Sequence, residues 1–347
     1  MSFAPDQRIP VRVLGATGAV GQRFVSLLAD HPWFELRAVA ASERSAGKRY
    51  GDAVRWALPG SPPAAIAALV VETVAAPSPE MLVFSALGSD IAGDIESAHA
   101  RAGALVVTNA SSHRMDADVP LIVPEVNPDH LGILSKGGGI LANPNCSTIG
   151  LVLALAPLHR AFVVEKLHVV TMQALSGAGM VGVGADLAMD NVVPYIPSEE
   201  EKLALEPAKI LGSLVGSLIE PADITVSAQC NRVAVSDGHT ECVSLSLGRD
   251  VTADEIREAW SSFRGLPQEL GLPSAPVHPI LVHDALDAPQ PVLHRDLEGG
   301  MACSVGRLAP CPVLGWRFTC LSHNTLRGAA GGALLAAELA VARGLVS

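Results

Sequence analysis

The sequence predicts an α/β protein whose first half is a doubly wound parallel sheet and whose second half is an α+β domain. Up to about residue 143, short apolar runs alternate with turns and a helical pattern. A glycine-rich turn at 15–21 directly follows the first of these runs. After residue 144 longer strands replace this pattern. The 347 residues also exceed the roughly 250–300 at which one core stops growing, so we expect two domains.

The composition excludes several classes of function. Hydrophobic residues make up 49% of the chain and charged residues 17%, as in an ordinary folded protein with ample core. The net charge of −11 argues against a nucleic-acid partner or an anionic membrane. An anionic ligand must therefore be held by cations that are grouped locally.

The cysteines point to a reducing compartment. The six are spread along the chain without CxxC spacing, which predicts neither a zinc site nor a disulfide framework. The first ten residues, MSFAPDQRIP, lack the apolar segment of a signal peptide. We expect a soluble cytoplasmic protein with reduced thiols and no metal.

A dinucleotide-binding turn is predicted near the N-terminus. Strand 11–14 runs into GATGAVG at 15–21, and apolar residues then recur at helical spacing up to His31. Such a turn lets the backbone approach a pyrophosphate, and the helix supplies N–H groups, as in a Rossmann-type fold. The spacing is GxxGxxG rather than GxGxxG, so a simple tight turn is the alternative. The candidate cofactor-binding residues here are Gly15, Thr17, Gly18, Ala19 and Val20.

The end of the second strand favours NADP over NAD. NAD enzymes usually place a carboxylate there for the ribose 2′-hydroxyl, whereas strand 34–40 of this chain is followed by ASERSAGK. Ser42, Arg44 and Ser45 suit a 2′-phosphate, although Glu43 lies among them. A solvated polar loop is the alternative.

Further strands are predicted at 69–71, 81–86, 105–107 and 121–123, with a helix around 90–100. Ligands of doubly wound sheets bind at the turns that follow the strands. SALGSD at 85–90 offers Ser85 and Ala86 to the cofactor, and NASSHRM at 109–115 offers Arg114 as an anion clamp. A surface arginine is the alternative for Arg114.

Cys146 is the candidate nucleophile. It lies in ANPNCSTIG, between a Pro-Asn turn and a predicted buried helix, with Ser147 and Thr148 as cap-type residues. A helix N-terminus favours the thiolate, which is the attacking form of cysteine. The alternative is a buried structural cysteine.

A hairpin is predicted in the second half. Strands at 166–174 and 224–228 precede CNRVAVSDGHTECVSLSL, in which Asp237-Gly238 has the form of a two-residue turn. Arg232 and His239 would then share one face about 13 Å apart and could bracket a small ligand. An ordinary polar hairpin face is the alternative.

Two later segments complete the chain. The run Glu199-Glu200-Glu201-Lys202 has the form of a solvated charged segment. After a strand at 317–321, a helix rich in small residues begins near Asn324 and could pack back on the first domain. We therefore divide the chain into a dinucleotide domain at 1–143, a catalytic and dimerisation domain at 144–323, and a returning helix at 324–347.

Taken together, these motifs resemble the aspartate-β-semialdehyde dehydrogenases, particularly their archaeal and fungal branch. The most specific matches are NPNCST, QALSGAG at 173–179, DGHTE and HNTLRGAAG, within a similarity that covers nearly the whole chain. N-acetyl-glutamyl-phosphate reductases share the architecture, but there a Gly precedes the cysteine and a Tyr follows it. Here Asn145 and Ser147 flank Cys146.

The resemblance implies a reaction and an assembly. The reaction is the reversible, NADPH-dependent reduction of L-aspartyl-4-phosphate to L-aspartate-4-semialdehyde and phosphate, in the biosynthesis of lysine, threonine and methionine. The assembly is a homodimer or homotetramer joined through the second domain.

It also implies roles for individual residues. Cys146 is the nucleophile, His239 the acid/base and Gln173 the residue that orients the acyl intermediate. Arg232 clamps the substrate carboxylate. The remaining residues are Arg114 and Lys202 for phosphate, Glu200 for the substrate ammonium, Asn145 for substrate, and Ser176, Gly177 and Asn324 for the cofactor. Three consecutive glutamates leave the register of Glu200 ambiguous by one.

Two rivals stay open at this point. Malonyl-CoA reductases of the same family keep a similar cysteine, arginine and histidine, although an ammonium site in the EEEK segment favours the aspartyl substrate. A non-catalytic dinucleotide-binding protein is expected to have lost at least one chemical residue, yet Cys146, Gln173, Arg232 and His239 are all present.

Overall fold

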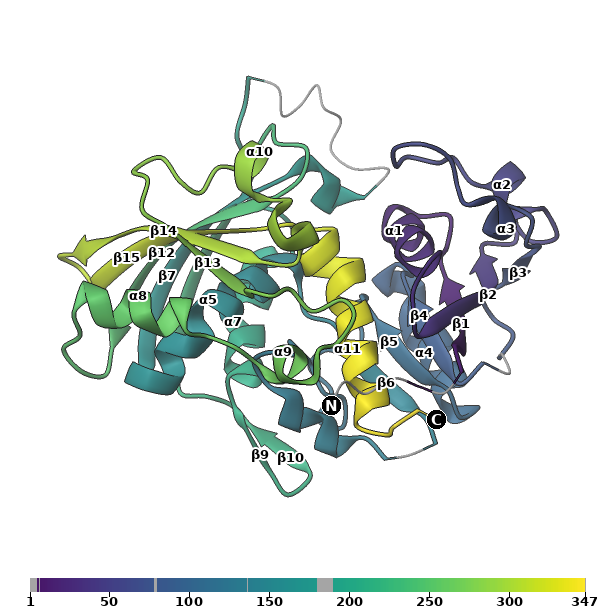
Figure 1. Cartoon of the computed structure of the whole chain (residues 1–347), viewed down its shortest axis with the longest axis horizontal. Coiled ribbons are helices and arrows are strands. Elements are labelled where there is room, and N and C mark those ends of the chain that lie inside the picture. Colours follow the sequence, from purple (N-terminus) through teal and green to yellow (C-terminus); the bar gives the residue numbers. More distant parts are fainter. Residues whose placement is uncertain (1–4, 6, 78–79, 136, 180–189, 347) are drawn as a thin grey trace.

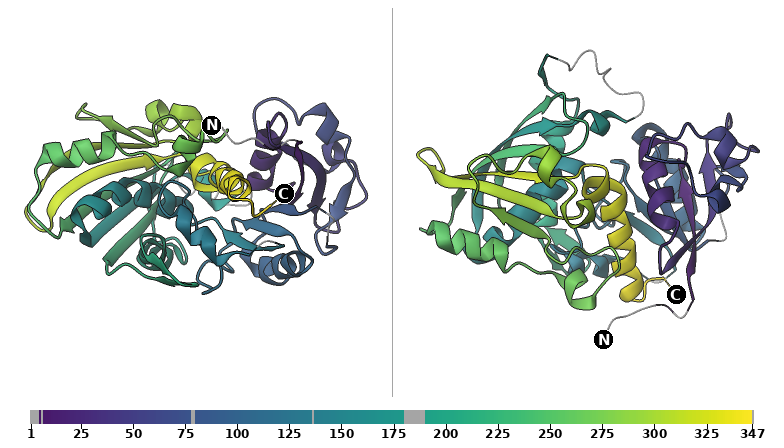
Figure 2. Two further views of the ribbon diagram at one scale, coloured as in Figure 1. Left: turned by 60° about the horizontal axis from the view of Figure 1, so that its bottom comes forward. Right: turned by 45° about the horizontal axis from the view of Figure 1, so that its top comes forward.

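The computed structural model describes residues 5, 7–77, 80–135, 137–179 and 190–346. Figure 1 shows two lobes, with the strands β1–β6 in one and a larger sheet in the other. Both views in Figure 2 place the C-terminal helix α11 (Gly331–Ala342) between the lobes. The predicted combination of a doubly wound sheet, an α+β lobe and a returning helix is confirmed.

The first sheet is parallel throughout and has the strand order β3-β2-β1-β4-β5-β6. This is the order of a Rossmann-type dinucleotide-binding sheet, whose ligands bind where the strand order reverses, beside β1 and β4. The strands are β1 (Ile9–Leu14), β2 (Phe34–Ala41), β3 (Val71–Thr73), β4 (Leu82–Ser85), β5 (Leu105–Thr108) and β6 (Gly139–Ala142). The helices of this lobe are α1 (Ala19–Leu28), α2 (Tyr50–Ala53), α3 (Ala64–Ala67) and α4 (Ser89–Arg101). The strand predicted at 69–71 thus begins two residues later.

The strand predicted at 121–123 is wrong. Leu121 makes only an isolated parallel bridge to Ala142, and the edge of the sheet is formed by β6. The ladder stops because the Asn127 side chain accepts the hydrogen bond of the Val123 N–H at 2.8 Å. The segment is nonetheless fully buried, which is why its apolar run has the form of a strand.

The second sheet is mixed and has the order β13-β14-β15-β12-β7-β11-β8. Helix α5 (Cys146–Phe162) contacts β7, β12, β14 and β15, with α7 (Glu199–Ile210) and α8 (Ala253–Ser261) beside it. The strands are β7 (Val164–Gln173), β8 (Val193–Pro194), β11 (Thr225–Arg232), β12 (His239–Leu247), β13 (Ile280–His283), β14 (Cys303–Cys311) and β15 (Gly315–Ser322). Outside it lie the pair β9 (Ser213–Val215) and β10 (Leu218–Glu220), and the short helices α9 (Leu266–Leu270) and α10 (Pro291–His294). In the described part of the chain, no helix is both long and apolar enough to span a bilayer.

The predicted hairpin is wrong in its pairing. Strand β7 lies between β11 and β12, parallel to the first and antiparallel to the second. Residues 233–238 therefore cross the end of β7, where Val235 and Ser236 accept hydrogen bonds from the N–H groups of Leu175 and Ser176. The Asp-Gly signal marks a bend before β12, and no local pattern reveals that a strand from far upstream in the sequence is inserted there.

The C-terminal segment joins the two lobes. A π-helical turn, Leu326–Ala330, leads into α11, whose residues 331–341 are all buried. The apolar residues among them pack in one core with β1, α1 and β5 of the first lobe, and the buried Glu338 carboxylate contacts His31 and Ser274.

A buried ion pair anchors this segment. Both terminal nitrogens of the Arg327 guanidinium donate to Glu125, at 2.8 and 2.5 Å, and both side chains are fully buried. Glu125 belongs to the first half of the chain, so the pair joins two segments that are distant in the sequence. Removal of one partner leaves an uncompensated buried charge, which typically costs about 3–5 kcal/mol.

We expect Arg327→Ala to lower the midpoint of urea unfolding, with a loss of about 3–5 kcal/mol in the free energy of unfolding, because Glu125 would remain as a buried charge without its partner. The matched control is Arg257→Ala, which breaks an exposed pair with Asp254 and should leave the midpoint unchanged. Equal shifts for the two variants would contradict the anchoring role of Arg327.

Candidate active site

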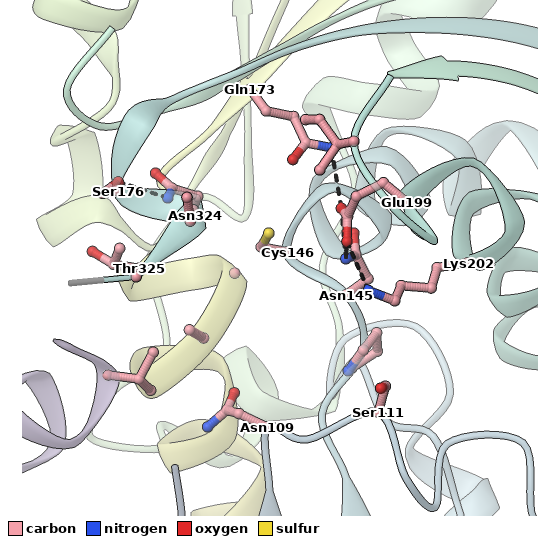
Figure 3. Close-up of a pocket in the computed structure, with 18 of the residues that line it drawn as sticks. Asn109, Ser111, Asn145, Cys146, Gln173, Ser176, Glu199, Lys202, Asn324 and Thr325 are labelled. Atoms are coloured by element: carbon pink, nitrogen blue, oxygen red, sulfur yellow. Dashed lines mark hydrogen bonds and ion pairs between the residues drawn. The ribbon is translucent and has the colours of Figure 1, made fainter. Parts of the chain in front are cut away.

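A cavity of about 460 Å³ opens between the lobes, with Cys146 in its wall. Figure 3 shows Cys146 near its middle, with Gln173, Glu199 and Lys202 on one side and Ser176 and Asn324 on the other. Its lining comes from the first lobe (Ala19, Val20, Ser89, Asn109, Ser111, Arg114), from the second (Asn145, Cys146, Gln173, Ser176, Gly177, Glu199, Lys202, Arg232) and from the C-terminal segment (Asn324, Thr325, Gly328). The structure thus brings together most of the predicted site residues.

Cys146 is the first residue of α5, and Asn145 is the N-cap. The Asn145 side-chain oxygen accepts hydrogen bonds from the N–H groups of Ser147 and Thr148, at 2.9 and 3.4 Å. The interpretation of Ser147 and Thr148 as caps is therefore wrong, because they already lie in the first turn. Gly328 packs against the cysteine: a Cβ there would lie 2.8 Å from Cys146 Cβ.

His239 contacts the thiol. Its Nε2 lies 3.2 Å from Cys146 Sγ, and its Nδ1 accepts the Ala174 N–H at 3.0 Å. A flipped ring would lose both contacts. Because Nδ1 is an acceptor, the neutral imidazole carries its hydrogen on Nε2, toward the sulfur.

Arg232 is anchored on the same residue as His239. Its Nη1 donates to the Ala174 carbonyl at 2.6 Å. A Cβ at Gly177 would lie 2.9 Å from Arg232 Nη1 and 3.0 Å from His239 Cε1, so both side chains converge on that glycine. Arg232 ends β11 and His239 begins β12, so the two residues flank the end of β7 from opposite sides. The separation that was expected for two residues on one face of a hairpin therefore does not apply to them.

Glu199, rather than Glu200, faces the cavity. Its carboxylate accepts hydrogen bonds from Asn145 Nδ2 (2.9 Å), Gln173 Nε2 (3.1 Å) and Lys202 Nζ (2.8 Å), as Figure 3 shows. Glu200 instead accepts the Cys230 N–H at 3.0 Å. The placement of Glu200 at the site is therefore wrong by one residue. A step of one residue turns a helix by about 100°, whereas positions i and i+3 share a side.

The expected activation of the thiol is absent in this state. Burial raises the pKa of the Cys146 thiol to about 12, and the charge of Glu199 adds to the rise. Burial also lowers the pKa of the His239 imidazole to about 3, with the charge of Arg232 adding to the fall. Both shifts favour the uncharged form, so we expect the resting pair to be a thiol beside a neutral imidazole.

The glycine turn fits a dinucleotide. Gly15 has φ +74°, and a Cβ there would lie 2.6 Å from the Ala86 carbonyl oxygen, so only glycine is accommodated. No side chain within the described residues caps α1, whose N-cap is Gly18. The N–H groups of its first turn are thus available to a pyrophosphate, and Ala19 and Val20 line the cavity. Thr17 lies in the turn between Gly15 and Gly18.

The other predicted cofactor residues differ in their surroundings. Ser42 and Arg44 are exposed just beyond the end of β2, and Ser45 is buried behind them. Ser85 is fully buried, and its hydroxyl donates to Glu96 at 2.5 Å. That hydroxyl is therefore committed to the core, and the assignment of Ser85 to the cofactor stays a prediction.

On the far wall, Asn324 links the C-terminal segment to the cofactor side of the cavity. Its amide donates to Ser176 Oγ and its oxygen accepts the Gly238 N–H, both at 2.8 Å. This contact holds Ser176 and Gly177 beside the bend that precedes His239.

Arg114 reaches the cavity from the first lobe. It donates to Glu206 at 2.9 Å and to the Asn109 carbonyl at 2.8 Å. Asn109 and Ser111 also line the cavity and were not predicted, although they stand in the NASSHRM turn that the strand pattern marks. Glu206 had no such signal, because its partners Asn145 and Arg114 lie far from it along the chain.

Family models match most of the chain. Residues 10–133 match the model described as semialdehyde dehydrogenase, NAD binding domain. Residues 155–327 match the model described as semialdehyde dehydrogenase, dimerisation domain.

Named relatives and solved structures agree with these matches. The aspartate-semialdehyde dehydrogenases of Methanothermobacter thermautotrophicus and Cryptococcus neoformans are each 46% identical, with coverage of 95% and 99% of this chain and 98% and 100% of theirs. The crystal structure of the Candida albicans enzyme with NADP is similar with a TM-score of 0.92 at 41% identity, over 97% of this chain and 100% of that one. The Vibrio cholerae aspartate semialdehyde dehydrogenase II complexed with ASA has a TM-score of 0.79 at 27% identity, over 97% and 99%.

We expect alkylation of Cys146 by iodoacetamide to be slow near neutral pH and to keep rising up to about pH 10, because the thiolate is the reactive form and the thiol pKa is raised. Glu199→Gln should speed the reaction several-fold, because it removes a charge that opposes the thiolate. Peptide mass mapping over time measures the rate at Cys146 alone.

Glu201→Gln is the matched control, since Glu201 is exposed on the same helix and should leave the rate unchanged. A rate that levels off below about pH 8 would show an activated thiolate in the resting protein and would contradict the neutral pair.

Proposed function

The chain belongs to the aspartate-semialdehyde dehydrogenase family, and we propose that its reaction proceeds through a thioester on Cys146. The reaction is the reversible, NADPH-dependent reduction of L-aspartyl-4-phosphate to L-aspartate-4-semialdehyde and phosphate. One observation above all supports the role of Cys146 as nucleophile. Its Sγ lies 3.2 Å from His239 Nε2, and Cys146 lies in the wall of the cavity between the lobes. A thiolate is a strong nucleophile, and its thioester accepts hydride more readily than a carboxylate does.

NADP(H) is the cofactor. When bound, its nicotinamide supplies or accepts the hydride of the reaction. We assign the pyrophosphate to the turn that contains Gly15 and Gly18, and the 2′-phosphate to Ser42, Arg44 and Ser45. The exposed Arg44 cation and Ser42 hydroxyl beyond β2 support that second assignment, as does the absence of a carboxylate at Ala41 and Ser42, the end of the strand.

His239 mediates the transfer of the thiol proton in this proposal: as sulfur attacks the carbonyl carbon, the proton that leaves sulfur ends on the thiohemiacetal oxygen, so the net charge of the site does not change. The Nε2–H of His239 points at Sγ, where it stabilises the negative charge that develops on sulfur by a charge-assisted hydrogen bond. In the thiohemiacetal the developing oxygen lies one bond beyond the carbon attached to sulfur and can take over the same donor. The Ala174 N–H holds the ring for both steps.

Arg232 binds the substrate carboxylate. One of its nitrogens is committed to Ala174, while its Nε is buried without a hydrogen-bond partner in the described chain. A carboxylate would accept one hydrogen bond from that nitrogen and a second, parallel one from a terminal nitrogen, an arrangement that the planar guanidinium fork favours. Gln173, whose amide contacts Glu199, borders the same space and is assigned to orientation of the acyl group.

The two ends of α7's first turn suit the remaining groups of the substrate. Glu199 offers a buried carboxylate to the ammonium, while Lys202 and Arg114 offer cations to phosphate. An ammonium site favours the aspartyl substrate over malonyl-CoA, which has no ammonium to pair with Glu199. The presence of Cys146 and His239 in contact disfavours a protein that only binds dinucleotides.

We also propose an assembly, a cellular compartment and a biosynthetic role for the protein. We assign the chain to a homodimer or homotetramer, supported by the match of residues 155–327 to a dimerisation domain. We place it in the cytoplasm, supported by six cysteines that all lie in described ranges as free thiols. Its product would serve the biosynthesis of lysine, threonine and methionine.

Cys146→Ser should lower turnover at least about 10³-fold while NADP binding stays within about twofold, because a hydroxyl is a far weaker nucleophile than a thiol. The measurement is NADPH formation from aspartate semialdehyde, NADP and phosphate, with malonyl-CoA plus NADPH assayed in parallel. When wild-type protein receives aspartate semialdehyde and NADP but no phosphate, it should also accumulate a thioester on Cys146, which mass spectrometry can detect. Cys242→Ser, which changes an exposed thiol, is the control. Turnover of malonyl-CoA alone would overturn the substrate assignment.

Glu199→Gln should raise the KM for aspartate semialdehyde about 10–100-fold, because a charge-assisted hydrogen bond contributes about 1.5–3 kcal/mol. Glu200→Gln changes the adjacent residue by the same atoms and should leave this KM within about twofold. A larger effect at position 200 than at position 199 would sink the assignment of the ammonium to Glu199. Steady-state kinetics on both variants decides between them.

A further inference from the structure

One side of α7 carries charges of alternating sign that face into the protein. Glu199, Lys202, Glu206 and Lys209 follow the spacing i, i+3, i+7 and i+10, which places them along one helix face. Glu199, Glu206 and Lys209 are buried, although the run of residues 199–202 had the form of a solvated charged segment. Buried charges of this kind are retained only with close partners, so each contact is informative.

Glu206 joins two parts of the cavity wall. Its Oε1 accepts a hydrogen bond from Arg114 Nη1 at 2.9 Å, and its Oε2 accepts the Asn145 N–H at 2.7 Å. Arg114 comes from the first lobe, and Asn145 is the N-cap immediately before Cys146. One carboxylate, only 2% exposed, thus connects the expected phosphate clamp to the N-terminus of the nucleophile's helix.

The loop that carries Arg114 is held from the same helix. Lys209 Nζ donates to the carbonyls of Arg114, Asp116 and Val119, at 2.7, 2.7 and 2.9 Å. With Nη2 of Arg114 on the Asn109 carbonyl, only its Nε is left without a partner among the residues described. The guanidinium is therefore held in place by bonds to both of its terminal nitrogens.

We propose that Glu206 is a positioning residue that sets Arg114, and hence phosphate, relative to Cys146. The proposal rests on the function assigned above. Within the described residues, the cavity wall includes Arg114 and Asn145 but not Glu206, so Glu206 acts through those two neighbours.

The two acceptor oxygens explain why a carboxylate is needed. A glutamine offers one acceptor and one donor, so Glu206→Gln must turn its NH₂ toward either the Arg114 guanidinium or the Asn145 N–H, both of which are donors. An aspartate keeps both acceptors but is shorter by one methylene, so Glu206→Asp cannot reach both partners at full strength. The two variants separate the number of acceptors from the reach of the side chain.

The experiment is steady-state kinetics in the direction that consumes phosphate. Glu206→Gln should raise the KM for phosphate about tenfold, and Glu206→Asp about threefold, while the KM for aspartate semialdehyde and the Kd for NADP stay within about twofold. Glu201→Gln removes the same charge from an exposed position of α7 and should change no constant by more than about twofold. Thermal melting of each variant establishes that it is folded.

Two outcomes would overturn the proposal. A lower KM for phosphate in Glu206→Gln would mean that Glu206 only neutralises Arg114, and a fall in kcat with all KM values unchanged would mean a purely structural role. A folded Glu206→Asp keeps the test decisive if Glu206→Gln does not fold.

A second assay distinguishes failure of the positioning role of Glu206 from failure of the proposed function. Inorganic phosphate should slow the alkylation of Cys146 in wild type, and this protection should need about tenfold more phosphate in Glu206→Gln. The assay requires no turnover. If wild type showed no activity with aspartate semialdehyde, the proposed function would fail, while loss of protection in Glu206→Gln would still support the positioning role. Equal protection in both proteins would overturn it.

Discussion

The contact between the Cys146 thiol and the fully buried His239 imidazole, in the wall of the cavity, is the constraint on which the rest of the site depends. Burial raises the pKa of the thiol and lowers that of the imidazole, so the uncharged form of each group is favoured before substrate binds. The charges that the reaction needs must then come from side chains around the pair, and these are fixed by contacts made before any substrate arrives. Examples are the hydrogen bond from Arg232 to the Ala174 carbonyl and the bond from Lys202 to the Glu199 carboxylate.

The site is built where several distant segments end. The end of β7 leads into Ala174, whose N–H orients His239 and whose carbonyl orients Arg232. Helix α7 supplies the carboxylates, and the C-terminal segment packs Gly328 against Cys146. The buried pair of Arg327 and Glu125 holds that last segment on the first lobe, so one ion pair keeps both the lobe contact and the cavity wall in place.

Sequence reasoning succeeded where the signal was local. The strand, glycine turn and helix at 9–28 were predicted because the apolar period and the glycines lie close together along the chain. It failed at the hairpin, because insertion of β7 between β11 and β12 depends on pairing between strands that are distant in the sequence. It failed again at 121–123, where a side chain, Asn127, takes the hydrogen bond that a neighbouring strand would have used.

The sequence by itself determined the class of fold, the turn for the dinucleotide and the residue types at the centre of the site: a cysteine at a helix start, a histidine, an arginine and a group of glutamates. These depend on the chemical identity of neighbours along the chain. The tertiary structure decided which glutamate faces the cavity, that Glu206 joins Arg114 to the helix of Cys146, and that burial raises the pKa of the thiol. Those outcomes depend on which side of a helix is buried and on how much water is excluded, and both are set by segments that meet only in the folded protein.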